Sequence, residues 1–284
     1  MKHTGRGEEH PRVGQAEGFL AHPAGPPRGA VLVLAGSSGR IEAERCRLFA
    51  ECGFVALSIR WFGGEGQPPG ICEIALETFV TALETLAGYS HNLGIVGVSK
   101  GAEAALLVAA RDSRVGTVVA LAPTDVVWAN LGAGRDGAEA PARSSWTWEN
   151  RALPFVPYDP MWEADQEPPS FAGLYRTSWA ADPGVTAAAS IPVETITATV
   201  VLVAGGDDRV WPSGEAAARI AARRKAAGLD TVVISHPGAG HRVIFPGETV
   251  QRGGQSMTRG GSEASDSELG AAAWPAILAA LEHP

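Results

Sequence analysis

Residues 93–109 read LGIVGVSKGAEAALLVA and combine a short apolar run, a serine between glycines and a helical pattern. The run LGIVGV has the length and composition of a strand that is buried on both faces of a parallel sheet. The residues after the serine place alanine and leucine at helical spacing. Between the two, Gly97-Val98-Ser99-Lys100-Gly101 fits G-x-S-x-G, a sharp strand-to-helix turn that raises the serine hydroxyl above the end of the sheet. The motif alone is common by chance, and the strand and helix around it give it weight.

Apolar strands alternate with helical patterns along most of the chain. This alternation predicts a mostly parallel, doubly wound sheet with helices on both faces, in one α/β domain over residues 1–284. Residues 1–12 and 246–269 are polar or rich in glycine and serine, so we expect them to be mobile. The strands are expected at 30–35, 54–59, 93–98, 115–122, 198–204 and 231–236, and the helices near 41–51, 72–87, 100–111, 213–227 and 269–281.

Residues 123–190 interrupt this alternation. They contain no convincing strand and carry many of the aromatic side chains, interleaved with prolines. Long insertions in compact domains usually act as lids or binding elements. We therefore predict a lid whose rings contact a substrate, with simple packing of the insertion onto the sheet as the alternative. The candidate substrate-binding residues are Trp61, Trp128, Trp146 and Trp148.

Ser99 needs a general base, because a free hydroxyl is scarcely ionised at neutral pH. His241 lies in the sequence PGAGH directly after the last expected strand. That position is at the carboxyl edge of the sheet, where residues of open α/β folds meet a ligand. His236, at the end of the same strand, is the alternative base.

The base needs an acidic partner that orients the imidazole and stabilises its cation. Asp207 and Asp208 follow the strand ATVVLVA directly, and the chain order Ser, Asp, His is typical of hydrolases with this kind of serine turn. We predict that Asp208 is the acid and that Asp207 caps either the turn or the helix that begins near Ser213. Asp125, after the preceding strand, is the alternative position for the acid.

An oxyanion that forms on the substrate needs backbone donors. The N–H of Lys100, which follows the serine, is one candidate, and the N–H of Ser37 is the second. Ser37 belongs to Gly36-Ser37-Ser38-Gly39, a loop small enough to approach a substrate oxygen closely.

Composition excludes several function classes. A formal charge of -8 argues against nucleic-acid binding, which needs a dense Lys/Arg surface. Three cysteines, without C-x-x-C spacing, favour neither a disulfide framework nor a zinc site, and we expect no metal and no cofactor. The sequence shows no signal peptide and no membrane span, which predicts a cytoplasmic protein. Arg219, Arg223, Arg224 and Lys225 suit a nucleotide phosphate or a solvated helix end, and we favour the solvated end.

The motifs together resemble the catalytic domain of the acyl-CoA thioester hydrolase / bile acid-CoA:amino acid N-acyltransferase family, of the α/β-hydrolase superfamily. The resemblance rests on VLVLAGSSG, FVALSIRWFG, LGIVGVSKGAEAALLVA, VLVAGGDDRVWPS and PGAGHRV. It implies the α/β-hydrolase fold, with Ser99 as nucleophile, Asp208 as acid and His241 as base. The conjugating members that the chain resembles use a cysteine nucleophile, whereas this chain has Ser99. We do not expect the β-sandwich domain of the animal enzymes in these residues.

These features predict a serine thioesterase that forms an acyl-Ser99 intermediate and resolves it with water. The acyl donor is expected to be an acyl-CoA or an acyl group on a carrier protein. Three alternatives stay open: an acyltransferase that uses an amine, thiol or alcohol acceptor, a carboxylesterase, and a non-catalytic binding protein on the same scaffold.

Overall fold

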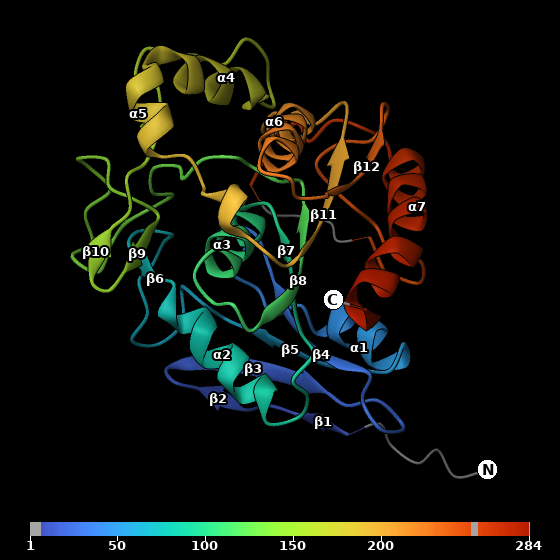
Figure 1. Cartoon of the computed structure of the whole chain (residues 1–284). Helices are drawn as coiled ribbons and strands as arrows, with labels where there is room; N and C mark the ends of the chain where they lie inside the picture. Colours follow the sequence, from blue (N-terminus) through green and yellow to red (C-terminus); the bar gives the residue numbers. More distant parts are fainter. Residues whose placement is uncertain (1–6, 251–254, 284) are drawn as a thin grey trace.

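A single twisted sheet organises the molecule, and the computed structural model describes residues 7–250 and 255–283. The sheet runs in the order β1-β3-β5-β4-β7-β8-β11-β12, and β2 pairs with β3 (Figure 1). The six strands from β5 to β12 in this order are parallel to their neighbours, whereas the pairs that involve β1, β2 and β3 are antiparallel. The strands are β1 (Glu8–Glu9), β2 (Arg12–Val13), β3 (Ala16–Ala21), β4 (Gly29–Leu34), β5 (Phe54–Ile59), β7 (Leu93–Val98), β8 (Val115–Leu121), β11 (Thr199–Gly205) and β12 (Val232–His236).

The six expected parallel strands are confirmed, and the antiparallel edge is an addition. The sequence reading predicted mobility for residues 1–12, yet residues 8–9 and 12–13 form β1 and β2. Residues 1–6 lie outside the described part of the chain. β3 was missed because AEGFLA carries a glutamate and a glycine, which interrupt the apolar run that marks the other strands.

Helices cover both faces of the sheet, as the doubly wound pattern predicted. α1 (Ala43–Glu51) and α7 (Glu263–Glu282) pack on one face, and α2 (Glu77–Ala87), α3 (Lys100–Ala109) and α6 (Ser213–Ala226) on the other. β4, β5, β7, β8 and β11 are buried on both sides, which explains their continuous apolar runs, whereas the edge strand β12 is largely exposed. In the part of the chain that the structure describes, no helix is long and apolar enough to cross a membrane.

Two helix boundaries differ from expectation for local reasons. α7 begins at Glu263, within the segment expected to be mobile, because Ser262 and Ser265 form a reciprocal capping box there. Residues 251–254 of that segment lie outside the described part of the chain. The helix expected from residue 72 begins at Glu77 instead, because Ile74–Ala75 pair as strand β6 with the insertion.

The insertion at 123–190 contains short elements that the sequence did not predict. β9 (Trp146–Trp148) pairs with β6 and with β10 (Arg151–Ala152) in a small second sheet. α4 (Ala172–Ala181) and α5 (Pro183–Ala188) follow, and a 3-10 turn at Val193–Thr195 leads into β11. Figure 1 shows α4 and α5 beyond the end of the sheet towards which β11 and β12 point. The insertion therefore lies on the side where the strands end, which is the side of the candidate site.

The strand-to-helix turn at Ser99 depends on two glycines that pack against backbone. A Cβ at Gly97 would lie 2.1 Å from the carbonyl oxygen of Gly101, and a Cβ at Gly101 would lie 2.4 Å from that of Ala35. No side chain can be accommodated at these distances unless the backbone moves. Gly94 on the same strand differs, because its Cβ would clash with the end of the Leu281 side chain, while the nearest backbone atom, the Thr117 carbonyl oxygen, lies at an ordinary contact distance of 3.7 Å.

Gly97→Ala should therefore destabilise the fold far more than Gly94→Ala. We expect Gly97→Ala to lower the free energy of unfolding by about 3 kcal/mol or more, and Gly94→Ala by about 1 kcal/mol, because the Leu281 side chain can rotate away. Urea denaturation of both variants measures the difference. Equal losses would contradict the close packing of β7 against α3.

Candidate active site

Ser99 occupies a strained turn at the end of β7. Its backbone has φ 56° and ψ -121°, a conformation that a residue with a side chain rarely adopts. The Ser99 N–H donates to the carbonyl oxygen of Leu121 on β8 at 2.9 Å, and the Ser99 carbonyl accepts from Ala102 and Glu103 in the first turn of α3. The turn is thus fixed by the neighbouring strand and by the helix, as the G-x-S-x-G motif predicted.

Asp208 and His241 lie together at the same edge of the sheet. His241 Nδ1 is 2.9 Å from Oδ2 and 3.0 Å from Oδ1 of Asp208, and the two side chains are 12% and 1% exposed. The carboxylate also accepts from Ser213 Oγ at 2.6 Å and from the Val210 N–H at 2.9 Å. A carboxylate held in this way keeps Nδ1 as the donor and leaves Nε2 free to accept a proton.

The alternative residues have other partners. Asp207 pairs with Arg209 and accepts from the Gly261 N–H, which lower the pKa of its carboxyl group. Asp125 binds Arg219 through two hydrogen bonds of 2.7 and 2.8 Å. His236 Nε2 lies 3.1 Å from Glu268 Oε2. Of the candidate acids and bases, the structure thus brings Asp208 and His241 together.

The loop that carries His241 is fixed by backbone contacts. The His241 N–H donates to the Arg259 carbonyl at 2.9 Å, and the Gly240 N–H donates to Asp266 Oδ1 at 2.7 Å. A Cβ at Gly205, the last residue of β11, would lie 2.0 Å from the Gly240 carbonyl oxygen. The histidine loop therefore packs directly on the strand that precedes Asp208.

The expected oxyanion loop lies against the serine. A Cβ at Gly36 would be 3.1 Å from Ser99 Cβ and 3.7 Å from Ser99 Oγ, so this loop passes directly beside the hydroxyl. Ser37 follows Gly36 in a turn that the hydrogen bond from Gly39 to Gly36 closes. Lys100 is the first residue of α3, and N–H groups of a helix's first turn lack partners within the helix. The backbone donors of Lys100 and Ser37 stay predictions.

The four candidate tryptophans separate into two groups. Trp61 and Trp146 are fully buried in the core with Phe79, so their selection as substrate contacts is corrected. Trp148 is partly buried against the same core and lies beside Arg111. Trp128 lines a cavity that it shares with Trp211, whose ring packs against that of His241. A sequence cannot distinguish these roles, because packing and binding both favour aromatic rings.

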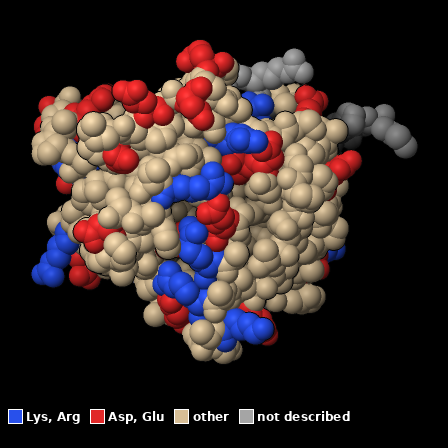
Figure 2. Space-filling view, turned by 90° about the horizontal axis from the view of Figure 1, so that it is seen from above, with Lys and Arg blue, Asp and Glu red and all other residues tan. Residues whose placement is uncertain are grey.

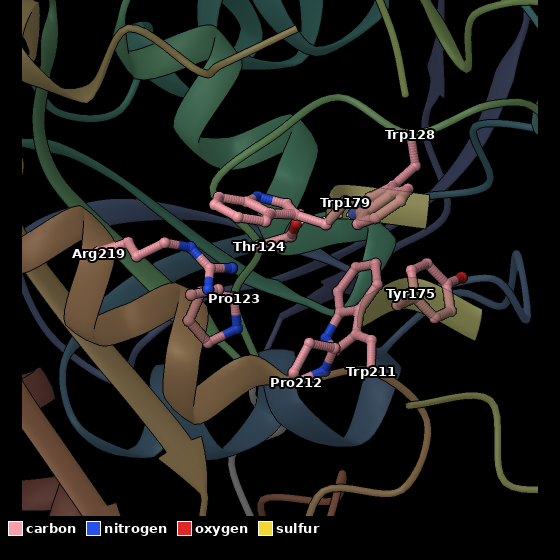
Figure 3. A pocket seen from close by; sticks show the side chains of 9 residues that line it. Pro123, Thr124, Trp128, Tyr175, Trp179, Trp211, Pro212 and Arg219 are labelled. Atoms are coloured by element: carbon pink, nitrogen blue, oxygen red, sulfur yellow. Dashed lines mark hydrogen bonds between the residues drawn. The ribbon is translucent and has the colours of Figure 1, made fainter. Parts of the chain in front are cut away.

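The cavity beside Trp128 has mostly apolar walls and room for about one water molecule. Figure 3 shows rings of the insertion and of the segment before α6 on its walls. Trp211 connects it to the candidate catalytic pair, since its ring centroid is 5.8 Å from that of His241. The sequence reading missed this residue, although it follows Asp208 by only three positions. The lining residues are Pro123, Thr124, Trp128, Tyr175, Trp179, Trp211, Pro212, Ala216 and Arg219.

A buried ion pair was also missed. Lys100 Nζ lies 2.9 Å from Glu103 Oε2, and the two side chains are 1% and 0% exposed. Burial lowers the pKa of the Lys100 amine, and the charge of Glu103 opposes this shift. A lysine and a glutamate in an otherwise apolar helix were the available signal, because such charges are rarely buried unless they are paired.

The arginines of α6 are engaged within the protein. Arg219 binds Asp125, Arg223 binds Glu194, and Arg224 donates to several backbone carbonyls while only 2% exposed. Figure 2 shows basic and acidic side chains interleaved over the face that is seen from above. The expected solvated helix end is therefore wrong for Arg224. In the described ranges, no three His, Cys, Asp or Glu side chains are grouped as metal ligands.

Comparisons with solved structures show the fold. The chain is similar to a thermostable carboxyl esterase from Bacillus coagulans, with a TM-score of 0.52 and 15% identity over 82% of this chain and 90% of that one. Together with the parallel sheet, this likeness shows that the chain has the α/β-hydrolase fold.

Comparisons with curated proteins and family models show the relationship. An acyl-coenzyme A amino acid N-acyltransferase 2 of Rattus norvegicus is 25% identical over 84% of this chain, and an acyl-coenzyme A thioesterase 6 of Mus musculus is 28% identical over 83%. The chain spans about half the length of these relatives, 54% of each. The family model described as BAAT / Acyl-CoA thioester hydrolase C terminal matches residues 75–283, and the protein belongs to this family.

Proposed function

We propose that this chain is an acyl-thioester hydrolase in which Ser99 is the nucleophile, His241 the base and Asp208 the acid. The observation that carries the proposal is the hydrogen-bonded pair of His241 and Asp208 at the sheet edge where the Ser99 turn ends. Family membership supports the thioester substrate, because the curated relatives are named as an acyl-CoA thioesterase and an acyl-CoA N-acyltransferase.

The proposed mechanism has two halves. His241 Nε2 takes the proton of Ser99 as Oγ attacks the thioester carbonyl, and the N–H groups of Lys100 and Ser37 bind the oxyanion. The C–S bond breaks and the thiolate leaves with little help, since thiols have pKa values of about 8.5. The departing sulfur takes up the proton that His241 holds, which restores the neutral imidazole. Water, deprotonated by His241, then attacks the acyl-Ser99 ester, and Ser99 leaves with the returned proton. Asp208 stabilises the imidazolium in both halves.

An acyltransferase is the second candidate, because one of the two relatives transfers its acyl group to an amino acid by its printed name. The first half of the reaction is the same, and only the acceptor differs. Intact-mass spectrometry with a panel of acyl-CoAs and acyl-carrier proteins detects acyl-Ser99 and identifies the donor. Amine, thiol and alcohol acceptors are then added to show whether any of them removes the acyl group from Ser99 faster than water does. Oxygen esters of the same acyl groups test the carboxylesterase alternative.

Ser99→Ala should abolish turnover and leave the fold intact. Loss of a triad nucleophile reduces kcat by about 10⁴ to 10⁶. The measurement is thioester hydrolysis by a preparation whose unfolding curve matches that of the unmodified chain. More than a few per cent of the original activity would contradict the assignment of Ser99.

Asp208→Asn should reduce activity by about 10⁴, because an amide stabilises the wrong tautomer of His241. Asp207→Asn is the matched control, since Asp207 contacts Arg209 and Gly261 instead of the histidine. We expect the control to retain activity within about a factor of ten. The measurement is the steady-state kcat/KM of both variants. A larger loss in Asp207→Asn than in Asp208→Asn would assign the role of acid to Asp207.

The insertion at 123–190 is proposed to act as the lid, with the cavity beside Trp211 as the start of the acyl site. Trp128, Tyr175 and Trp179 belong to the insertion, whereas Trp211 precedes α6 and contacts His241. Because the cavity admits about one water molecule, an acyl chain enters only when these rings move apart.

Trp179→Ala should therefore shift the preference towards bulkier acyl groups. Removal of the ring opens about 60 Å² of additional apolar contact, and at about 25 cal/mol per Å² this raises the kcat/KM ratio of bulky over acetyl thioesters about tenfold. Trp274→Ala is the control, because Trp274 packs with Phe49 and Phe245 on the opposite face of the sheet. An unchanged ratio in Trp179→Ala would reject the cavity as the acyl site.

A further inference from the structure

The first turn of α3 reaches the insertion through a buried carboxylate. Glu103 Oε1 accepts the Trp128 backbone N–H at 3.0 Å and the Trp146 Nε1–H at 2.7 Å. Trp128 lies near the start of the insertion and Trp146 lies on β9, so one oxygen joins two separate parts of it. The same residue donates its own N–H to the Ser99 carbonyl at 3.1 Å. Glu103 thus connects the serine turn and the insertion directly.

Lys100 reaches the same segments from the other side of the ion pair. Its Nζ donates to Ser145 Oγ at 2.8 Å, and Ser145 Oγ donates to the Ala129 carbonyl at 2.8 Å. Ser145 and Ala129 are the neighbours of Trp146 and Trp128 in the chain. Both members of the ion pair therefore hold the same two segments, and the residue directly after the nucleophile is one of them.

Trp128 continues this connection to the candidate base through aromatic contacts. Its ring centroid is 4.7 Å from that of Tyr175, which is 5.5 Å from Trp211, and Trp211 is 5.8 Å from His241. These three rings line the cavity that is proposed to start the acyl site. The backbone of Trp128 is fixed by Glu103, so the position of one cavity wall depends on this carboxylate.

Stability alone does not account for the pair. Two charges taken out of water lose hydration that their attraction only partly restores, and apolar residues of similar volume are often as stable. What an apolar pair cannot supply is an acceptor for the two N–H groups of the insertion. The distinctive contribution of Glu103 is therefore the geometry that it imposes on Trp128 and Trp146.

We propose that Glu103, with Lys100 as its counter-charge, is a positioning residue that holds the insertion against the Ser99 turn and thereby sets the affinity of the acyl site. The proposal rests on the proposed function, because it treats the cavity beside Trp128 as part of the substrate site. Glu103 acts through Trp128 and Trp146 and takes no part in the chemical step.

Glu103→Gln and Glu103→Leu form a matched pair for the test. Both remove the negative charge at similar volume, but the glutamine amide oxygen still accepts the two N–H groups and leucine does not. In Glu103→Leu we expect the backbone amide of Trp128 to exchange with solvent deuterium about tenfold faster than in Glu103→Gln, the effect of one lost hydrogen bond. KM for acyl thioesters should rise about tenfold in Glu103→Leu, while kcat per folded molecule changes less than about threefold.

The outcomes separate the proposal from its alternatives. Equal amide exchange and equal KM values in the two variants would overturn it, and so would a loss confined to kcat and the folded fraction, which indicates a merely structural role. If Trp128 exchange differs as expected but the unmodified chain forms no acyl-Ser99, the positioning role stands and the proposed function fails. Should Glu103→Leu not fold, Trp146→Phe removes one donor to Glu103 and leaves a smaller aromatic ring in its place, and its KM should rise about threefold. An unchanged KM in a folded Trp146→Phe would equally count against the proposal.

Discussion

The close approach of β7 and α3 at Gly97 and Gly101 is the constraint on which the site depends. With 2.1 Å between a Gly97 Cβ and the Gly101 carbonyl oxygen, the strand and the helix are in direct backbone contact. The chain can turn so abruptly from β7 into α3 only if Ser99 takes a positive φ. In such a turn the serine side chain is exposed at the end of the sheet. Gly101 in turn packs on Ala35 at the end of β4, and this contact brings the loop at Gly36 against the serine. The same backbone contacts thus position both the Ser99 hydroxyl and the loop that is expected to bind the oxyanion.

Close backbone packing at glycines also occurs where Asp208 and His241 meet. Gly205 packs on the Gly240 carbonyl, and a Cβ at Gly240 would lie 2.3 Å from the carbonyl oxygen of Gly260. Three loops that are distant in the sequence therefore stack backbone on backbone, without side chains between them. Such contacts leave little room for displacement, because close-packed backbone has no rotamers to relax through. The glycine contacts and the hydrogen bond to Asp208 therefore fix the position of His241 together.

The sequence was most informative where burial produces a regular pattern of apolar residues. β4, β5, β7, β8 and β11 are buried on both faces, so their apolar runs are continuous and were found. The edge strand β12 is largely exposed, and its β-branched residues marked it instead. β9 and β10 have three and two residues, too few for any period; β9 pairs with the distant β6, and β10 pairs with β9. Motif and chain order singled out Ser99, Asp208 and His241, since loop chemistry at strand ends is local in the sequence. The Lys100–Glu103 pair was not found, because its partners Ser145 and Trp146 lie more than 40 residues away. Asp125 shows the same effect, since the Arg219 that engages it is 94 residues distant.

The two halves of the candidate site are held by different kinds of contact. Backbone packing fixes Ser99, Asp208 and His241, whereas the insertion is joined to them through Glu103, Lys100 and the rings around Trp211. Backbone packing tolerates almost no substitution, because any added Cβ collides with a carbonyl group. Side-chain contacts can be exchanged one at a time, each at a cost of about 1 kcal/mol for an ordinary hydrogen bond. Sequence change can therefore remodel the insertion and its cavity while the sheet edge that carries Ser99, Asp208 and His241 stays the same. This division gives a physical reason why one family can include an acyl-coenzyme A thioesterase and an acyl-coenzyme A amino acid N-acyltransferase.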